Sequence, residues 1–137
     1  MTTLDRADQS LSVTAKEPPR ILVVDAALAL QDSHVLLLRS IPAIVEIVSS
    51  YFDMYLHEEH GYALVILALH SESRETAEAA HFVRRRWSAA RILLLQDASA
   101  TIDDWLYDER IDPRLHPAAV RETAIRLMTD YKYCISA

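Results

Sequence analysis

The chain has 137 residues, of which 51% are hydrophobic, and this length suits one compact domain with a sizeable core. Its 14 basic and 20 acidic residues give a net charge of -6, which excludes broad attraction to nucleic-acid phosphates. The one cysteine, Cys134, excludes an intramolecular disulfide and a zinc site built from thiolates, and it favours a reducing cytoplasm. No apolar run approaches the roughly 18 residues of a spanning helix. We therefore expect a soluble cytoplasmic protein that binds neither nucleic acid nor a membrane.

The chain is predicted to contain one folded domain with short extensions. Residues 1–18 are polar and lack periodicity, which is typical of a flexible leader or a short docking arm. Residues 19–132 would form the domain, and residues 133–137 would form a C-terminal tail.

Aliphatic runs predict the strands of a parallel sheet, because strands covered on both faces are apolar along their whole length. The run at 62–69 is uniformly apolar, so we expect it at the centre of the sheet. The other predicted strands are residues 20–25, 43–48, 91–96 and 104–107.

Two helices are predicted before the central strand. Apolar residues at helical spacing indicate the first over residues 28–41, and Pro42 ends it. The second would cover residues 49–60, with Gly61 as its C-terminal stop. Its expected inward-facing side chains are Phe52, Tyr55 and Leu56.

Two further helices are predicted after the central strand. Ser71 or Ser73 can cap the first, whose buried stripe is Ala80, Val83 and Trp87. The arginines at 84–86 crowd its end, where the helix dipole favours cations, so we interpret them as solvated. The last helix starts at Pro113 or at Pro117, two alternatives that the sequence leaves open, and its apolar stripe is Val120, Ala124, Leu127 and Tyr131.

Five alternations of strand and helix predict an α/β fold, since right-handed crossovers build a three-layer sandwich around a parallel five-stranded sheet. One crossover departs from this pattern. Residues 97–102 are too few for an ordinary helix before a strand at 104–107, so the fourth helix is predicted to be shortened or missing.

Four motifs follow one another within residues 19–130: Ile21–Asp25, Tyr62–His70, Asp103–Asp108 and Ile111–Leu115. Together they resemble the receiver domain of bacterial two-component response regulators. Ile21-Leu-Val-Val-Asp25 is similar to that family's first strand with its acidic end, and Tyr62-Ala-Leu-Val-Ile-Leu-Ala-Leu-His70 is similar to the third. Asp103-Asp-Trp-Leu-Tyr-Asp108 resembles the fifth strand, and Ile111-Asp-Pro-Arg-Leu115 resembles the entry to the last helix. The resemblance implies a flavodoxin-like (βα)5 topology.

The resemblance also implies a phosphorylation pocket, and this chain lacks most of its residues. The position of the acceptor aspartate is Ala68, which offers no nucleophile. The acidic pair that holds Mg²⁺ is reduced to Asp25 followed by Ala26. Gln96 stands for the switch hydroxyl, and Asp108 stands for the lysine that pairs with the phosphoryl group. We therefore expect a degenerate pocket without catalytic residues, cofactor or Mg²⁺.

The leading hypothesis is a phosphorylation-independent pseudo-receiver that signals through protein contacts, with a second copy of the chain as one candidate partner. The altered edge carries Trp105 and Tyr107, which are candidate anchors for an interaction surface. Two alternatives remain open. One is a small nucleotide- or flavin-binding enzyme on the same fold, which a chain with one glycine disfavours. The other is a receiver phosphorylated at another residue, such as His70 or Ser71.

The histidines at 57 and 60 have the i, i+3 spacing of two ligands on one helical face, but no third ligand is evident. We interpret them as solvated residues near a helix end rather than a metal site.

Overall fold

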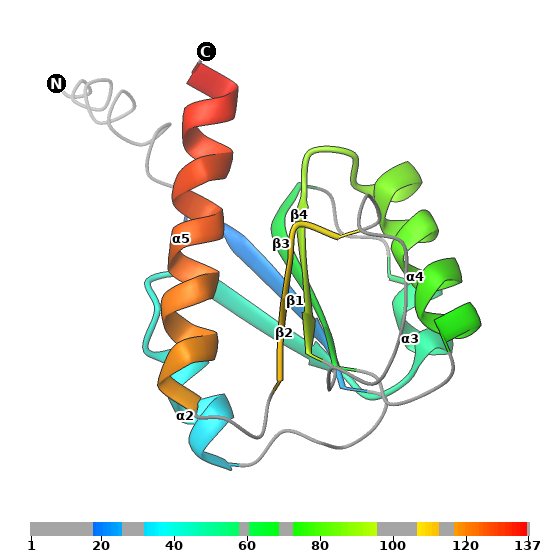
Figure 1. Cartoon of the computed structure of the whole chain (residues 1–137), viewed down its shortest axis with the longest axis horizontal. Helices are drawn as coiled ribbons and strands as arrows, with labels where there is room; N and C mark the ends of the chain where they lie inside the picture. Colours follow the sequence, from blue (N-terminus) through cyan, green and yellow to red (C-terminus); the bar gives the residue numbers. More distant parts are fainter. Residues whose placement is uncertain are drawn as a thin grey trace, which may run out of the picture.

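The computed structural model describes residues 18–25, 32–57, 61–68, 73–95, 107–112 and 117–136 (Figure 1). Its elements are β1 (Arg20–Val24), α2 (Asp32–Arg39), β2 (Ile44–Val48), α3 (Tyr51–Tyr55), β3 (Tyr62–Ala68), α4 (Ser73–Arg86), β4 (Arg91–Leu95), β5 (Glu109–Ile111) and α5 (Pro117–Ser136). All paired strands are parallel, in the order β2-β1-β3-β4-β5. The predicted α/β architecture is confirmed.

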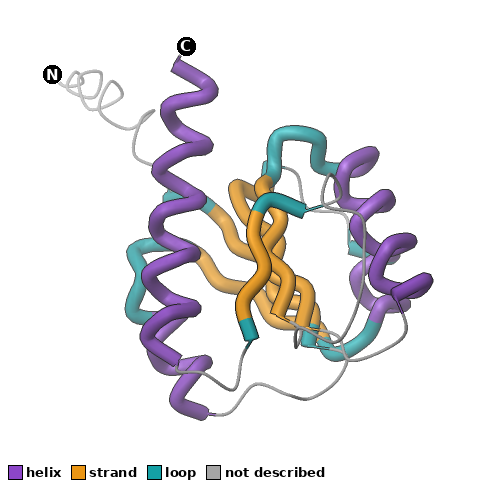
Figure 2. Tube along the Cα trace, viewed as in Figure 1, coloured by secondary structure: helices purple, strands orange, loops and turns teal. Residues whose placement is uncertain are grey.

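Helices cover both faces of the sheet, so the molecule has three layers (Figure 2). Helices α2 and α5 lie on one face, and α3 and α4 lie on the other (Figure 1). Alternate residues along a strand enter different core clusters: Ile92 and Leu94 pack with the α3–α4 side, whereas Leu93 and Leu95 pack with the α2–α5 side. This alternation explains why both faces of each inner strand are apolar.

Strand β3 occupies the centre of the sheet, as predicted, and all seven of its residues are buried. Full burial contributes about 1.5–3 kcal/mol for each large aliphatic side chain. Burial of β3 therefore fixes the position of Ala68 at its carboxyl end.

The predicted orientation of the second helix was wrong. Phe52, Tyr55 and Leu56 are 68%, 41% and 60% exposed, and Met54 is the buried residue. The Ser50 side chain accepts a hydrogen bond from the backbone N–H of Asp53, so the helix begins at Tyr51 and turns Met54 toward the sheet.

The predicted end of this helix was also wrong. Its C-terminal cap is Leu56, whereas Gly61 lies directly before β3 with φ of 76°. Gly61 therefore serves the entry to the central strand, where a positive φ suits a residue without a Cβ.

The fifth strand was predicted too early. It covers Glu109–Ile111 rather than 104–107, so the segment between β4 and β5 is longer than the sequence pattern indicated. Residues 96–106 lie outside the described part of the chain, and the shortened fourth helix stays a prediction.

The last helix begins at Pro117, the second of the two alternatives, and buries Val120, Ala124 and Leu127 as predicted. It continues to Ser136, so most of the predicted tail belongs to the helix. The predicted leader lies almost wholly outside the described residues. No helix among those described has both the length and the apolar character needed to cross a membrane.

Candidate functional site

The carboxyl ends of the parallel strands meet at one edge of the sheet, where ligands of doubly wound folds bind. Strand pairing sets Ala68 beside Leu95, and Leu95 beside Ile111. Val24 pairs with Leu67, so Asp25 follows β1 at the level of Ala68. The edge therefore brings Asp25 and Ala68 to the same level.

The two residues present very different chemistry at this edge. Ala68 is fully buried within the core cluster on the α2–α5 side of the sheet. Asp25 is 8% exposed, and its backbone N–H donates to the carbonyl oxygen of Val48 at 2.9 Å. A methyl group thus ends the central strand, and one carboxylate lies beside it.

Other predicted site residues fall outside the described part of the chain: Ala26, Gln96, Trp105, His60, His70 and Ser71. Within the part that the structure does describe, no group of three His, Cys, Asp or Glu side chains is placed to hold a metal ion.

The placement of Asp108 in the phosphorylation pocket was wrong. Asp108 precedes β5, and its backbone N–H donates to the carbonyl oxygen of Ile92 at 2.9 Å. It therefore lies at the amino-terminal edge of the sheet, opposite the carboxyl edge. The error follows from the strand boundary, since a strand at 104–107 would have ended at Asp108.

Asp108 instead joins three elements at that edge. One carboxylate oxygen accepts the backbone N–H of Ile92 at 2.7 Å, and Arg91 donates to the other at 3.2 Å. Arg84, in the last turn of α4, reaches the same carboxylate at 3.4 Å. Arg84 is thus an ion-pair partner that fastens α4 to β4, rather than a solvated cation.

Asp112 takes the position that the sequence analysis had assigned to Asp108. It follows Ile111, the last residue of β5, and so lies at the carboxyl edge of the sheet. In the chain it precedes Pro113, whereas the receiver pattern has lysine before proline at this point. A carboxylate therefore follows β5 at this edge, and a proline comes next in the sequence.

A second polar cluster, which the sequence analysis missed, surrounds Glu46 of β2. Its carboxylate accepts hydrogen bonds from Arg20 at 2.7 Å and from the Tyr62 hydroxyl at 2.5 Å, and it lies 2.9 Å from Nε2 of His57. Burial raises the pKa of Glu46, but the hydrogen bonds of Tyr62 and His57 and the charges of His57 and Arg20 leave the pKa below its ordinary value. The cluster links β1, β2, β3 and the end of α3.

The signal for this cluster is one charged residue in the middle of an aliphatic strand, Ile44-Val-Glu-Ile-Val48. Such a residue needs partners when the strand is packed. The sequence could not identify them, because Arg20 and Tyr62 arrive through strand pairing.

The candidate anchor Tyr107 is only partly exposed. It packs against the core cluster on the α3–α4 side, and the guanidinium of Arg110 lies 5.9 Å from its ring centre. Among the described residues, the strongly exposed aromatic side chain is instead Phe52 of α3.

No protein-family model and no curated protein sequence matches the chain. Solved structures do. A CheY-like response regulator receiver domain protein from Methanospirillum hungatei has a TM-score of 0.67 and 16% identity, over 85% of this chain and 98% of that one. A response regulator of Thermotoga maritima in complex with Mg²⁺ and BeF has a TM-score of 0.59 and 23% identity, over 80% of this chain and 98% of that one. The chain has the receiver fold.

A solved structure of a protein of another kind is also similar to this chain. The adenylate cyclase from Rhodopirellula baltica has a TM-score of 0.70 and 14% identity, over 87% of this chain and 93% of that one. At these identities the likeness establishes the receiver fold alone, so function has to be argued from the residues at the carboxyl edge.

Proposed function

We propose that the chain is a pseudo-receiver, which transmits a signal through protein contacts without accepting a phosphoryl group. The observation that carries this proposal is Ala68 at the end of the central strand. Phosphoryl transfer to a receiver needs a carboxylate that attacks phosphorus. A buried methyl group cannot form that bond.

The charges at the carboxyl edge support the same proposal. Asp25 and Asp112 both follow strands there, and the sequence places Ala26 where the second acid of a Mg²⁺ pair would stand. Mg²⁺ prefers several oxygen ligands, and one carboxylate at this position supplies too few. A phosphoryl group would meet Asp112 instead of a lysine, and like charges repel.

An enzyme is the second candidate, and the adenylate cyclase among the structural neighbours gives it a specific basis. Close approach of the backbone to nucleotide phosphates usually needs glycines at the carboxyl edge of the sheet. The one glycine of this chain, Gly61, lies before β3, at the opposite edge. We therefore propose a regulator of protein partners in the cytoplasm, without catalytic activity or cofactor.

A thermal-shift titration tests the proposal. Neither Mg²⁺ with beryllofluoride nor Mg²⁺ with ATP should raise the melting temperature of the full chain in a saturable way. A saturable rise with beryllofluoride would overturn the loss of the phosphoryl site, and one with ATP would favour the enzyme.

The chain offers a matched gain-of-function variant. The triple substitution A26D/A68D/D112K restores the receiver pattern at the edge positions assigned above. We expect this variant, once circular dichroism shows that it is folded, to gain a response to Mg²⁺ and beryllofluoride that the parent chain lacks.

A further inference from the structure

An apolar patch lies on the outside of α3. Phe52 and Leu56 are four positions apart and are 68% and 60% exposed, and Tyr55 between them is 41% exposed. Side chains at this spacing share one side of a helix. Large apolar residues gathered in this way, rather than scattered, are typical of interaction sites.

Helix α4 lies beside α3 and extends this patch (Figure 1). The ring of Phe82 meets the ring of Tyr55 edge to face, with 4.8 Å between their centres. Phe82 is partly buried, and its contact with Tyr55 joins the exposed side chains of α3 to those of α4. We call this joined surface the α3–α4 face. It consists of Phe52, Tyr55, Leu56, Glu78, Phe82 and Arg85.

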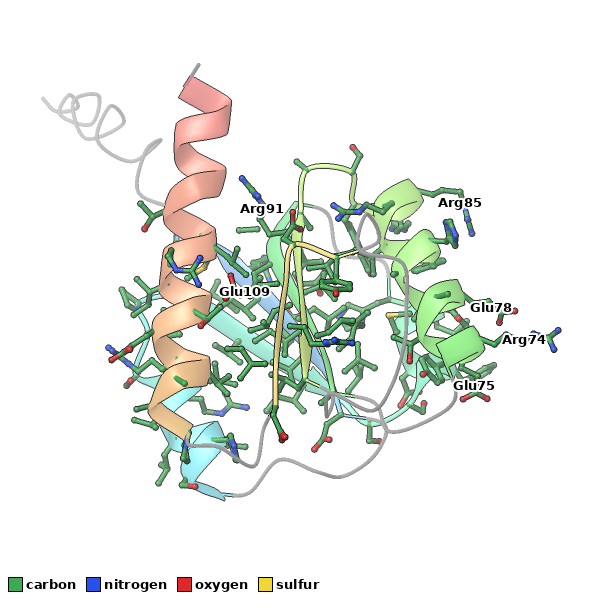
Figure 3. The ribbon with its side chains drawn as sticks, viewed as in Figure 1. Arg74, Glu75, Glu78, Arg85, Arg91 and Glu109 are labelled. Carbon is green, nitrogen blue, oxygen red and sulfur yellow. The ribbon has the colours of Figure 1, made fainter. Side chains whose placement is uncertain are left out.

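Charges of both signs border the aromatic part of this face. Glu78 and Arg85 are exposed and project outward from different turns of α4 (Figure 3). Burial and the carboxylates of Glu78 and Glu75 raise the pKa of Tyr55, whereas the charge of Arg85 lowers it. Among the described residues, no carboxylate forms an ion pair with Arg85, whereas Glu78 forms an exposed ion pair with Arg74 of the preceding turn at 3.7 Å. A partner's Arg85 would therefore join or replace Arg74 at Glu78.

The spacing of the two charges is what makes the face self-complementary. Glu78 and Arg85 are seven positions apart, which is two helical turns, or roughly 10 Å along one side of the helix. When two copies of α4 pack antiparallel about a two-fold axis, each residue i that meets j is matched by j meeting i. An axis near Phe82 would then set Glu78 of each copy against Arg85 of the other.

We propose that the α3–α4 face binds a second copy of this chain in this antiparallel arrangement. Two symmetric Glu78–Arg85 pairs would flank a centre formed by Phe82 and Tyr55, with Phe52 and Leu56 covering the sides. The aromatic centre supplies apolar burial, and the charge pairs set the orientation. The surface goes beyond the proposed function, because self-association of this face requires no phosphoryl chemistry.

Charge reversal in the full-length chain tests the arrangement by sedimentation velocity over a concentration series. Glu78→Arg and Arg85→Glu should each weaken the dimer about tenfold or more, since either change sets like charges against one another at both ends. The double variant E78R/R85E should recover the parent affinity. An equimolar mixture of the two single variants should form a heterodimer, because each copy then offers the charges that the other needs.

A matched control separates this effect from a change in net charge. Glu122 is exposed on α5, on the other side of the sheet, so Glu122→Arg should leave the dimer unchanged. Thermal melts by circular dichroism establish that each variant is folded.

Any of three results would overturn the proposal. The parent chain could stay monomeric at every concentration, or Glu78→Arg could leave the dimer as strong as in the parent. The third is that the mixture of the two single variants forms no heterodimer. A monomeric chain that also ignores Mg²⁺ and beryllofluoride would refute the dimer and leave the pseudo-receiver intact. A chain that dimerises as predicted and also binds beryllofluoride would refute the pseudo-receiver and leave the dimer intact.

Discussion

Replacing Asp108 by alanine should destabilise the domain even though this residue lies at the edge of the sheet opposite the carboxyl edge. Its side chain is 19% exposed. The carboxylate accepts hydrogen bonds from the backbone N–H of Ile92 near the start of β4 and from the guanidinium groups of Arg84 and Arg91. The Asp108→Ala variant loses all three contacts at once. The strand β4 then keeps a backbone donor without an acceptor at this point.

The size of the effect follows from the individual contacts. A backbone donor left without its acceptor in a half-buried site costs about 1–3 kcal/mol. The two arginine pairs are partly exposed, and each adds at most about 1 kcal/mol. We therefore expect Asp108→Ala to lower the free energy of unfolding by about 2–4 kcal/mol. Asp108→Asn keeps an acceptor for Ile92 and should cost only about 1 kcal/mol.

Urea denaturation followed by far-ultraviolet circular dichroism measures these differences. The neighbouring carboxylate of Glu109 is a matched control, because it makes one exposed ion pair with Arg126 at 2.8 Å. Glu109→Ala should therefore cost less than about 1 kcal/mol. An Asp108→Ala variant as stable as Glu109→Ala would refute the assignment of Asp108 to the fastening of α4, β4 and β5.

Three further predictions concern other parts of the domain. The folded pKa of Glu46 lies below its ordinary value of 4.5, so Glu46 contributes stability that is present above that pH and is lost as the pH falls through the folded pKa. In the Glu46→Gln variant, the free energy of unfolding should therefore decrease less steeply as the pH falls below 4.5. Urea denaturation at several pH values measures this, and a decrease as steep as in the parent chain would contradict the prediction. Trp87 is 4% exposed and packs edge to face on Tyr62, with 4.9 Å between the ring centres. Trp87→Ala should therefore lower the free energy of unfolding by about 3–5 kcal/mol in the same denaturation assay. A decrease below about 1 kcal/mol would show that the ring is not part of the core. Phe52→Ser should change the stability of the monomer by less than about 0.5 kcal/mol, and a large loss would mean that its ring is buried in the monomer.

The sequence predicted most of the fold because its strands are continuous aliphatic runs. Such runs are covered on both faces, which requires a parallel sheet between two helical layers. The burial of the whole of β3, of Ala80 and Val83 on α4 and of Trp87 directly after it confirms this prediction. The common level of Asp25 and Ala68 follows from the same argument, because parallel strands end at a common edge.

The elements that were predicted wrongly, α3 and β5, are too short to show a periodic pattern, so local features set their orientation and position. Helix α3 has five residues, too few for a stripe, and the cap formed by Ser50 sets which side faces the sheet. The short strand β5 contains Glu109 and Arg110, so its sequence has no aliphatic run that would predict a strand. The segment 104–107 has more apolar character than β5, so its pattern predicts a strand there and places Asp108 at the carboxyl edge, whereas Asp108 precedes β5.

The polar clusters could not be predicted, since their members come together only through strand pairing. Arg20 and Tyr62 reach Glu46 from neighbouring strands, and Arg84 reaches Asp108 across the end of α4. Glu46 stands out in the sequence as a charge within an aliphatic strand, but its partners do not.

Intact-mass spectrometry after incubation with acetyl phosphate and Mg²⁺ tests the central claim most directly. A response regulator with the full acidic site, treated in parallel, provides the positive control. Because Ala68 offers no nucleophile, the chain should keep its unmodified mass while the control gains one phosphoryl group. A stable addition of one phosphoryl mass to this chain, mapped by peptide analysis to His70, Ser71 or any other residue, would contradict the account.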